Sequence, residues 1–339
     1  MNQRRLLWRF GILSMVLGFT APAFGAGQEA MRVVQPQHKT YVLGSVIHLV
    51  VAADPVKIDR ISFTINNQKP VIFDISREKQ NMLTGGMAYQ CILAELDAGD
   101  NNIHFYGYRQ GNKVAEQERQ VYYAEKYSKD KSTPPSDYRH QVFHTAQNEG
   151  VCLECHAELG RADKKVTVLK ESPCYKCHTY EVSKKAKHGP AAVGACTACH
   201  NPGGSEKYGV EKPINKLCSR CHGDTIAAWK VMKYLHGPTA TGDCSICHSP
   251  HSSDERFFLH KKTNVLCTGC HEEKASGRHV VVGFSSPSHP VAGKSNPLKP
   301  DRDFSCASCH SPHAANSREL FAFETGGGRF GVCQICHKK

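Results

Sequence analysis

The stretch HGPTATGDCSICHSPHSS, residues 236–253, contains two cysteines and three histidines in one short polar segment. It has no apolar face that could become the buried side of a helix or a strand. Thiolate and imidazole are metal ligands, so their density here indicates a bound metal or a metal-containing group.

The same pattern, Cys-x-x-Cys-His, occurs eight times and contains sixteen of the seventeen cysteines. The cysteine pairs are Cys152/Cys155, Cys174/Cys177, Cys196/Cys199, Cys218/Cys221, Cys244/Cys247, Cys267/Cys270, Cys306/Cys309 and Cys333/Cys336. The histidines that follow them are His156, His178, His200, His222, His248, His271, His310 and His337. This is the attachment signature of c-type haem, in which two thioethers hold the vinyl groups and the histidine binds iron.

Zinc ribbons, iron–sulfur clusters and thioredoxin-like pairs also use closely spaced cysteines. None of them requires a histidine directly after the second cysteine of each pair. A disulfide framework does not require the cysteines to be confined to CxxC pairs after residue 150. The sequence therefore predicts eight covalent haems, with the eight motif histidines as proximal iron ligands.

The motifs are organised in an internal repeat of four units, each with two motifs. His144, His188 and His236 each stand eight residues before the first cysteine of a unit, and Gly150, Gly194 and Gly242 stand two before it. His289 takes the same place in the fourth unit, although an insertion around residues 296–300 moves it seventeen residues from Cys306.

At this point the sequence resembles the doubled-CxxCH multihaem cytochromes c. The signature H-G-P…G-x-C-x-x-C-H-x-P-H is nearly whole in the third unit, and the fourth unit keeps SCASCHSPH. The second unit departs from it, with Gly203 in place of the last histidine, and the first unit has Leu159 there. The resemblance covers about residues 139–339 and implies an octahaem cytochrome.

Nine further histidines in this region can supply the distal ligands of eight irons, whereas Met232 is its only methionine. His248 is the proximal ligand of its own motif, which leaves His236 and His251 for neighbouring haems. We expect His260, which has no counterpart in another unit, to be the spare. The predicted distal ligands are His140, His144, His188, His236, His251, His279, His289 and His313.

Residues 1–25 read as a signal peptide, with Arg4, Arg5 and Arg9 before an apolar run and Gly25 before the expected cleavage point. The alternative, an uncleaved anchor, is less favoured because the apolar run is short and interrupted by glycine. Export to the periplasm, with outer-membrane association or an extracellular place as alternatives, is the expected localisation.

Residues 26–123 are predicted to form an all-β sandwich, and 124–138 a polar linker with Pro134 and Pro135. The run LDAGDNNIHFYGY, residues 96–108, resembles a strand-turn-strand of immunoglobulin-like modules. Cys91 is interpreted as a small buried thiol. His38, His48 and His104 are interpreted as ordinary strand or loop residues. The expected strands are 46–52, 58–65, 87–96, 101–109 and 114–123.

Residues 139–339 have few periodic apolar runs, and one helix is expected over residues 224–235. The fold class is therefore an immunoglobulin-like sandwich followed by a haem-packed domain of short helices and loops with little regular secondary structure.

The formal net charge of +12 falls to +9 when the three arginines of the signal are removed. Eight haems, each with two propionates, bring it to about +1 when oxidised and about −7 when reduced. The basic side chains are explained by propionate compensation, and we expect no nucleic-acid partner.

Irons closed by two imidazoles favour a low-potential electron carrier over an enzyme. The expected partners are other cytochromes and membrane quinol-oxidising or outer-membrane complexes. Two alternatives stay open: an octahaem reductase of nitrogen or sulfur oxyanions, which needs one vacant iron, and a protomer of an extracellular cytochrome filament, which needs self-assembly.

Overall fold

The structure, a computed structural model, describes residues 29–75, 83–84, 86–153, 166–275, 279–280, 289–293, 295–324, 326 and 331–337. The predicted signal peptide, Cys155 and His156 lie outside these residues. Within them, no helix has the length and apolar character needed to cross a membrane.

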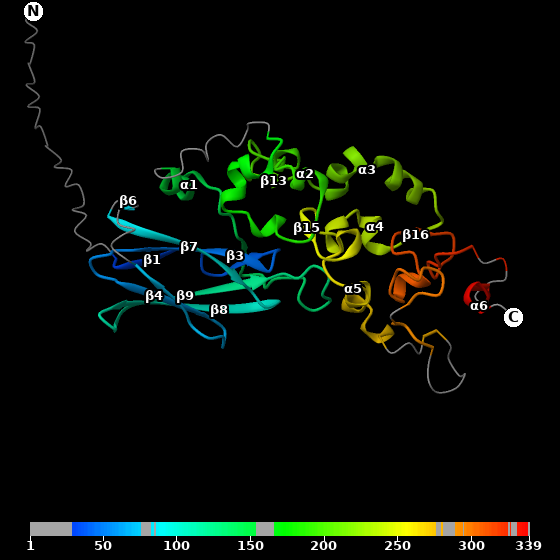
Figure 1. Cartoon of the computed structure of the whole chain (residues 1–339), viewed down its shortest axis with the longest axis horizontal. Helices are drawn as coiled ribbons and strands as arrows, with labels where there is room; N and C mark the ends of the chain where they lie inside the picture. The colour runs from blue at the N-terminus through cyan, green and yellow to red at the C-terminus, as the bar shows by residue number, and fades with distance from the viewer. Residues whose placement is uncertain are drawn as a thin grey trace, which may run out of the picture.

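The N-terminal part is a β-module of two sheets (Figure 1). One sheet has the order β1-β3-β7-β6, formed by Met31–Gln35, Val46–Ala53, Met87–Glu95 and Leu83–Thr84. The other has the order β10-β2-β9-β8-β4-β5, formed by Arg139–His140, Thr40–Val42, Asn112–Tyr123, Gly99–Arg109, Arg60–Ile65 and Val71–Asp74.

Period-two patterning explains these strands. Along β8, Asn101, Ile103 and Phe105 are buried and alternate with partly or fully exposed neighbours, so one face of the strand turns to the core. Full burial of an Ile or Phe side chain contributes about 1.5–3 kcal/mol. Gln110 and Gly111, both with positive φ, close the β8–β9 hairpin between Arg109 and Asn112, as a type I′ turn requires.

All five predicted strands are present, with small shifts at their ends. The strand predicted to begin at residue 58 begins at Arg60 as β4. Strand β8 begins at Gly99, before the predicted start at residue 101, because the Asn101 side chain accepts from the Asp97 N–H and donates to the Asp97 carbonyl. The turn therefore lies just before Gly99, whose φ is +98°.

The C-terminal part consists of short elements, as predicted. Its helices are α1 (Ala146–Leu153), α2 (Gly189–Ala192), α3 (Ile214–Lys230), α4 (Gly237–Thr241), α5 (Thr263–Cys270) and α6 (Gly331–Cys336). Its two-residue strands pair as β11 (Ala186–Lys187) with β15 (Ser252–Ser253), β12 (His200–Asn201) with β13 (Gly209–Val210), and β14 (Tyr234–Leu235) with β16 (Ala314–Ala315). The remaining elements are single 3-10 turns, η3 (Leu169–Glu171), η4 (Pro173–Lys176), η5 (Tyr180–Val182), η6 (Cys196–Ala198), η7 (Cys244–Ile246), η8 (Arg256–Phe258), η9 (Glu272–Lys274) and η10 (Cys306–Ser308).

The predicted bounds of the one expected helix are wrong. Helix α3 begins at Ile214, after Pro213, and ends at Lys230, whereas Tyr234 and Leu235 form β14. The helix has non-helical φ and ψ at His222, where the fourth motif ends. Asp224, where the helix was expected to begin, lies inside α3, because the motif itself forms the preceding helical turns.

This C-terminal part has little apolar core of its own. Among the described residues after 139, the buried hydrophobic side chains are Val182, Leu266, Ala314 and Ala315. The β-module, in contrast, buries a continuous cluster that includes Leu49, Ile61 and Phe105. A region of this length with so few buried apolar side chains is consistent with an interior filled by a non-protein group.

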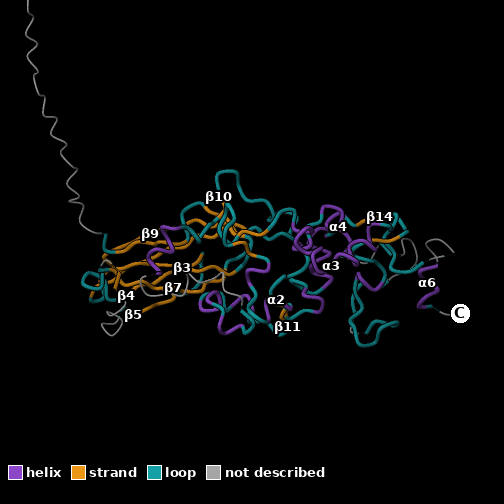
Figure 2. The backbone as a smooth tube through the Cα atoms, turned by 90° about the horizontal axis from the view of Figure 1, so that it is seen from above, coloured by secondary structure: helices purple, strands orange, loops and turns teal. Residues whose placement is uncertain are grey.

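Residues 124–138 connect the two parts and contact both. Ala124 and Tyr127 are buried, and the Ala124 N–H donates to the Val42 carbonyl of the β-module. On the other side, the Lys129 N–H donates to the carbonyl of Gly269 in α5. The chain is elongated, with the β-module at one end and α6 at the other (Figures 1 and 2).

Candidate haem-iron sites

Five of the described motifs close one turn of helix with the same backbone bond. The backbone N–H of the motif histidine donates to the carbonyl of the first cysteine at 2.8 Å for His178, 3.1 Å for His248, 2.9 Å for His271, 3.0 Å for His310 and 2.8 Å for His337. An i to i+4 turn brings residues three and four apart onto neighbouring positions. The local backbone therefore presents both thiols and the imidazole together.

The glycine two residues before a unit's first cysteine has a steric reason in two units. Gly194 and Gly242 both have a φ of +74°, a conformation that other residues adopt at a cost. A Cβ on Gly242 would lie 2.5 Å from the Asn215 side chain, and one on Gly194 would lie 2.9 Å from the Leu169 Cα. Glycine is thus needed to bring the preceding unit close to the motif.

The motif histidines face the predicted distal histidines in pairs. The distances between ring centroids are 6.0 Å for His178 and His144, 5.9 Å for His200 and His251, 6.1 Å for His222 and His188, 6.0 Å for His248 and His313, 6.2 Å for His271 and His236, and 6.2 Å for His337 and His289.

This spacing fits one iron between two imidazoles. A metal–imidazole nitrogen bond is about 2 Å long, so two rings on opposite sides of one iron have centroids about 6 Å apart. Within the described residues, no three or more His, Cys, Asp or Glu side chains gather into a cluster that could hold a bare ion. The facing pairs therefore fit haem, because the porphyrin supplies the other iron ligands and two imidazoles are enough to complete them.

Short strand pairs explain how the distal ligands reach their places. The pairing of β11 with β15 continues into a bond from the His188 N–H to the His251 carbonyl at 2.9 Å. The pairing of β14 with β16 continues in the same way from His236 to His313, also at 2.9 Å. The histidine before a unit thus serves the second haem of its own unit, and the last histidine of the HSPH segment serves the first haem of the preceding unit.

Carbonyl groups orient three proximal histidines through Nδ1, which leaves Nε2 for iron. His200, His248 and His310 bond the carbonyls of Tyr208, Phe257 and Glu319, each at 2.7 Å. Left-handed backbone stands at or just after each carbonyl, at Tyr208, Phe257 and Leu320. Such residues cost about 1 kcal/mol or more each, so these turns accept backbone strain and in return fix the orientation of the imidazole. The sequence analysis missed these carbonyl partners, although the third and fourth units share the same arrangement.

Burial keeps several paired imidazoles neutral, the form that binds iron. Burial is the main cause that lowers the pKa of His178 and of His313 to about 4, and neighbouring histidines lower it further. Burial also lowers the pKa of His236. For His251, burial alone would lower the pKa, but the hydrogen bond and charge of Glu181 raise it.

Two of the predicted iron sites are less completely described. Burial lowers the pKa of His279, and the nearby His310 lowers it further. The two imidazoles therefore lie within electrostatic range of each other. His140 lies beside Tyr41 of β2, with its Nδ1 3.5 Å from Glu206. His140 was predicted only as one of the distal ligands, and the first motif, whose Cys152 lies in α1, is the one that the pairs above leave for it.

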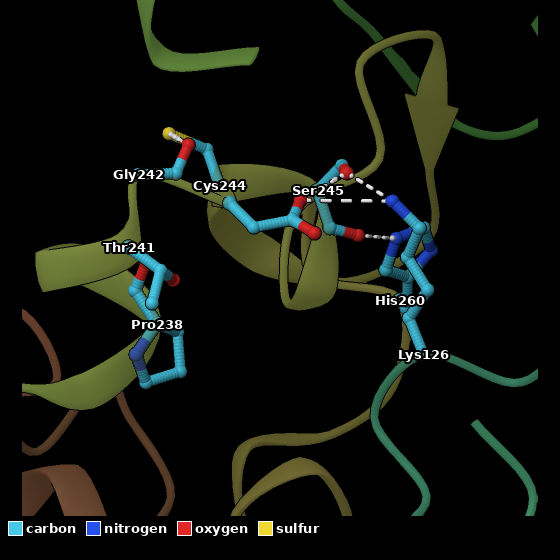
Figure 3. A network of polar contacts seen from close by, with 8 residues as sticks. Lys126, Pro238, Thr241, Gly242, Cys244, Ser245 and His260 are labelled. Carbon is cyan, nitrogen blue, oxygen red and sulfur yellow. Dashed lines mark hydrogen bonds and ion pairs between the residues drawn. The ribbon is translucent and has the colours of Figure 1, made fainter. Parts of the chain in front are cut away.

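His260, predicted as the spare, has no imidazole partner of this kind among the described residues. Its Nε2 bonds the Ser245 carbonyl at 3.1 Å (Figure 3). Its ring stacks on Tyr127. Its backbone N–H donates to the Cys247 carbonyl, and in the fourth unit Ala322 makes the same bond to Cys309. An alanine therefore takes this place without a ligand side chain.

The attachment cysteines of neighbouring motifs lie close together, so the motifs follow one another in space in the order of the sequence. Thiols of successive units touch, Cys174 with Cys196, Cys218 with Cys244, and Cys267 with Cys306. Within units, Cys199 lies in electrostatic range of Cys221, Cys247 of Cys270, and Cys309 of Cys336. Neighbouring haems therefore have neighbouring attachment points.

The β-module contacts the second motif. The Nε2 of His48 is 3.0 Å from the Cys177 carbonyl, and its ring meets the edge of His178 at 5.5 Å. His48 was interpreted as an ordinary strand or loop residue. The alternation of residue types along β3 was the signal that its side chain faces outward. His38 and His104 instead contact Gln120 and Tyr106 inside the module.

The interpretation of Cys91 as a buried thiol is wrong. Cys91 is exposed on the outer face of β7, opposite Val50, because the period of two places Ile92 and Ala94 toward the core instead. Partial desolvation by the surrounding protein raises the pKa of Cys91 to about 11, and the nearby Cys177 and Cys152 thiols raise it further.

One of the comparisons with known proteins supports the attachment motifs. The family of the doubled CXXCH motif matches residues 188–227, 236–276 and 297–339, which correspond to the second, third and fourth units. No curated protein and no solved structure matches the chain. The paired CXXCH motifs indicate a multihaem c-type cytochrome with covalently bound haems, which implies electron transfer.

Proposed function

We propose that this protein is an octahaem electron carrier in which every iron has two imidazole ligands. The single observation that carries the proposal is the set of six imidazole pairs with centroids 5.9–6.2 Å apart. When bound, haem supplies a one-electron couple between ferric and ferrous iron. The paired histidines would hold the irons, and the groups around them would orient the imidazoles and keep several of them neutral.

The order of the motifs supports transfer along the chain by hopping from haem to haem. Contacts between Cys174 and Cys196, and between the equivalent pairs of later units, join each unit to the next. The elongated region between the β-module and α6 would then carry electrons between two partners (Figure 1). We propose redox proteins in the periplasm or at the cell surface as these partners.

His140 is our proposal for the distal ligand of the first haem. By the rule that the later units follow, this ligand would come from residue 203, which is glycine. The Nδ1 of His140 is 3.5 Å from Glu206, three residues further along the same loop, and His140 is anchored there by the pairing of β10 with β2. A histidine from outside the repeat would thus replace the missing one.

The β-module is proposed to be immunoglobulin-like. Its sheets β1-β3-β7-β6 and β2-β9-β8-β4-β5 have the strand distribution of such sandwiches. Its outer face, with His48 and Cys91, lies against the first two motifs, so the module would shield this end of the haem array as well as dock a partner.

Exposure of the reduced protein to carbon monoxide at neutral pH tests the proposal against the reductase alternative. We expect the low-spin spectrum to persist, and turnover of nitrite and hydroxylamine to be negligible, because a closed iron must lose a ligand before it binds either molecule. A substantial ligand-binding fraction in the unmodified protein would favour the reductase.

A further inference from the structure

The distal histidines differ in what holds their Nδ1 atoms. His236 and His289 bond the backbone carbonyls of Pro312 and Pro290, both at 2.9 Å. His144 and His251 instead bond carboxylates, those of Glu149 at 3.0 Å and Glu181 at 2.7 Å. The distal ligands of the second and third haems are therefore the ones whose Nδ1 is hydrogen-bonded to a carboxylate, whereas the Nδ1 of His140 stays 3.5 Å from Glu206.

A carboxylate acts on such a ligand more strongly than a carbonyl does. It draws the Nδ1 proton toward itself in a charge-assisted hydrogen bond, which makes the imidazole a more basic donor. A more basic ligand stabilises ferric iron over ferrous iron, so the potential of that haem falls.

The two carboxylates do not present the same net negative charge to their histidines. Glu149 also bonds the ammonium of Lys207 at 2.5 Å, and this cation offsets part of its effect on His144. Among the ion pairs of the described residues, Glu181 has His251 as its only partner. Its position is also fixed, because the Ser252 hydroxyl, next to His251, donates to the Glu181 carbonyl at 2.6 Å.

We infer that Glu149 and Glu181 are positioning residues that set the second and third haems as the low-potential segment of the array, with the third haem lowest and reduced last. The inference rests on the proposed axial pairs, because it concerns residues that act through His144 and His251. The two haems are neighbours, since Cys174 and Cys196 touch, so electrons on the remaining haems meet an uphill step at this segment.

Replacement of Glu181 by glutamine tests this inference in the haem-loaded full-length protein. E181Q keeps a hydrogen-bond acceptor for His251 but removes the charge. We expect potentiometric titration to show one haem potential raised by about 59 mV, equivalent to a tenfold change in the ferric-over-ferrous preference. The electron paramagnetic resonance g values of one low-spin haem should shift with it.

Lys207 provides a second variant with the opposite sign. K207Q leaves Glu149 its full charge, so we expect one haem potential to fall. E116Q and K113Q are the matched controls, because Glu116 and Lys113 form an exposed ion pair of the same chemistry in β9 and contact no predicted haem ligand among the residues that the structure describes. These controls should leave each potential unchanged.

If E181Q and K207Q leave all potentials where E116Q and K113Q leave them, the inference is wrong. If E181Q fails to load its haems, the K207Q result alone decides. Failure of the proposed axial pairs is a separate outcome, because it appears as carbon-monoxide binding in the unmodified protein, whereas failure of this inference appears as unchanged potentials in fully low-spin variants.

Discussion

Replacement of His236 by alanine should open one iron and no other. The ring of His236 faces His271 at 6.2 Å, its Nδ1 bonds the Pro312 carbonyl, and its backbone N–H bonds the His313 carbonyl. Alanine keeps the backbone bond, so the pairing of β14 with β16, and with it the neighbouring ligand His313, should persist. We therefore expect carbon monoxide to bind one haem in eight, the haem of Cys267 and Cys270.

His260 gives the matched control for this experiment. H260A loses a hydrogen bond to Ser245 and a ring contact with Tyr127, about 1–2 kcal/mol together, while H236A loses the Pro312 bond, about 1 kcal/mol, and an axial ligand. The two variants thus differ chiefly in ligation. Difference spectra of the reduced proteins should show carbon-monoxide binding in H236A alone. Equal binding in both variants, or none in H236A, would refute the assigned pairing.

Three further predictions follow from the same geometry. Denaturing mass spectrometry of the mature protein should show eight covalent haems, and fewer than seven would contradict the array. H140A should open the first haem to carbon monoxide, because Gly203 cannot supply its ligand, and an unchanged low-spin spectrum would exclude His140 as that ligand. H48F should leave every iron closed, since His144 faces His178 at 6.0 Å, yet shift the resonance of the second haem, and a new high-spin signal would instead mean that His48 is a ligand.

Much of the fold was predictable because the relevant signals are local. The strands of the β-module follow from alternation, as in β8, and the motif turns follow from the spacing of cysteine and histidine. The helix around residues 224–235 was misplaced because apolar periodicity is weak there. Its true extent, Ile214–Lys230, is set by Pro213 and by the fourth motif, which is itself helical.

The pairing of ligands could not be read from the sequence, because it depends on contacts between units. The motif spacing leaves open which iron His236 or His251 serves. Only the pairing of β11 with β15 and of β14 with β16 places each histidine opposite a particular motif. The contact of His48 with the second motif is likewise a long-range packing event, and β3 alternation alone does not reveal its partner.

A Mössbauer spectrum of the ⁵⁷Fe-labelled, fully oxidised protein tests most directly whether every iron is closed by two imidazoles. The spectrum counts all irons at once, including that of the first motif. We expect a single class of low-spin ferric iron that accounts for the entire absorption. A high-spin ferric component of one eighth of the iron or more would show a vacant axial position and contradict the electron-carrier proposal.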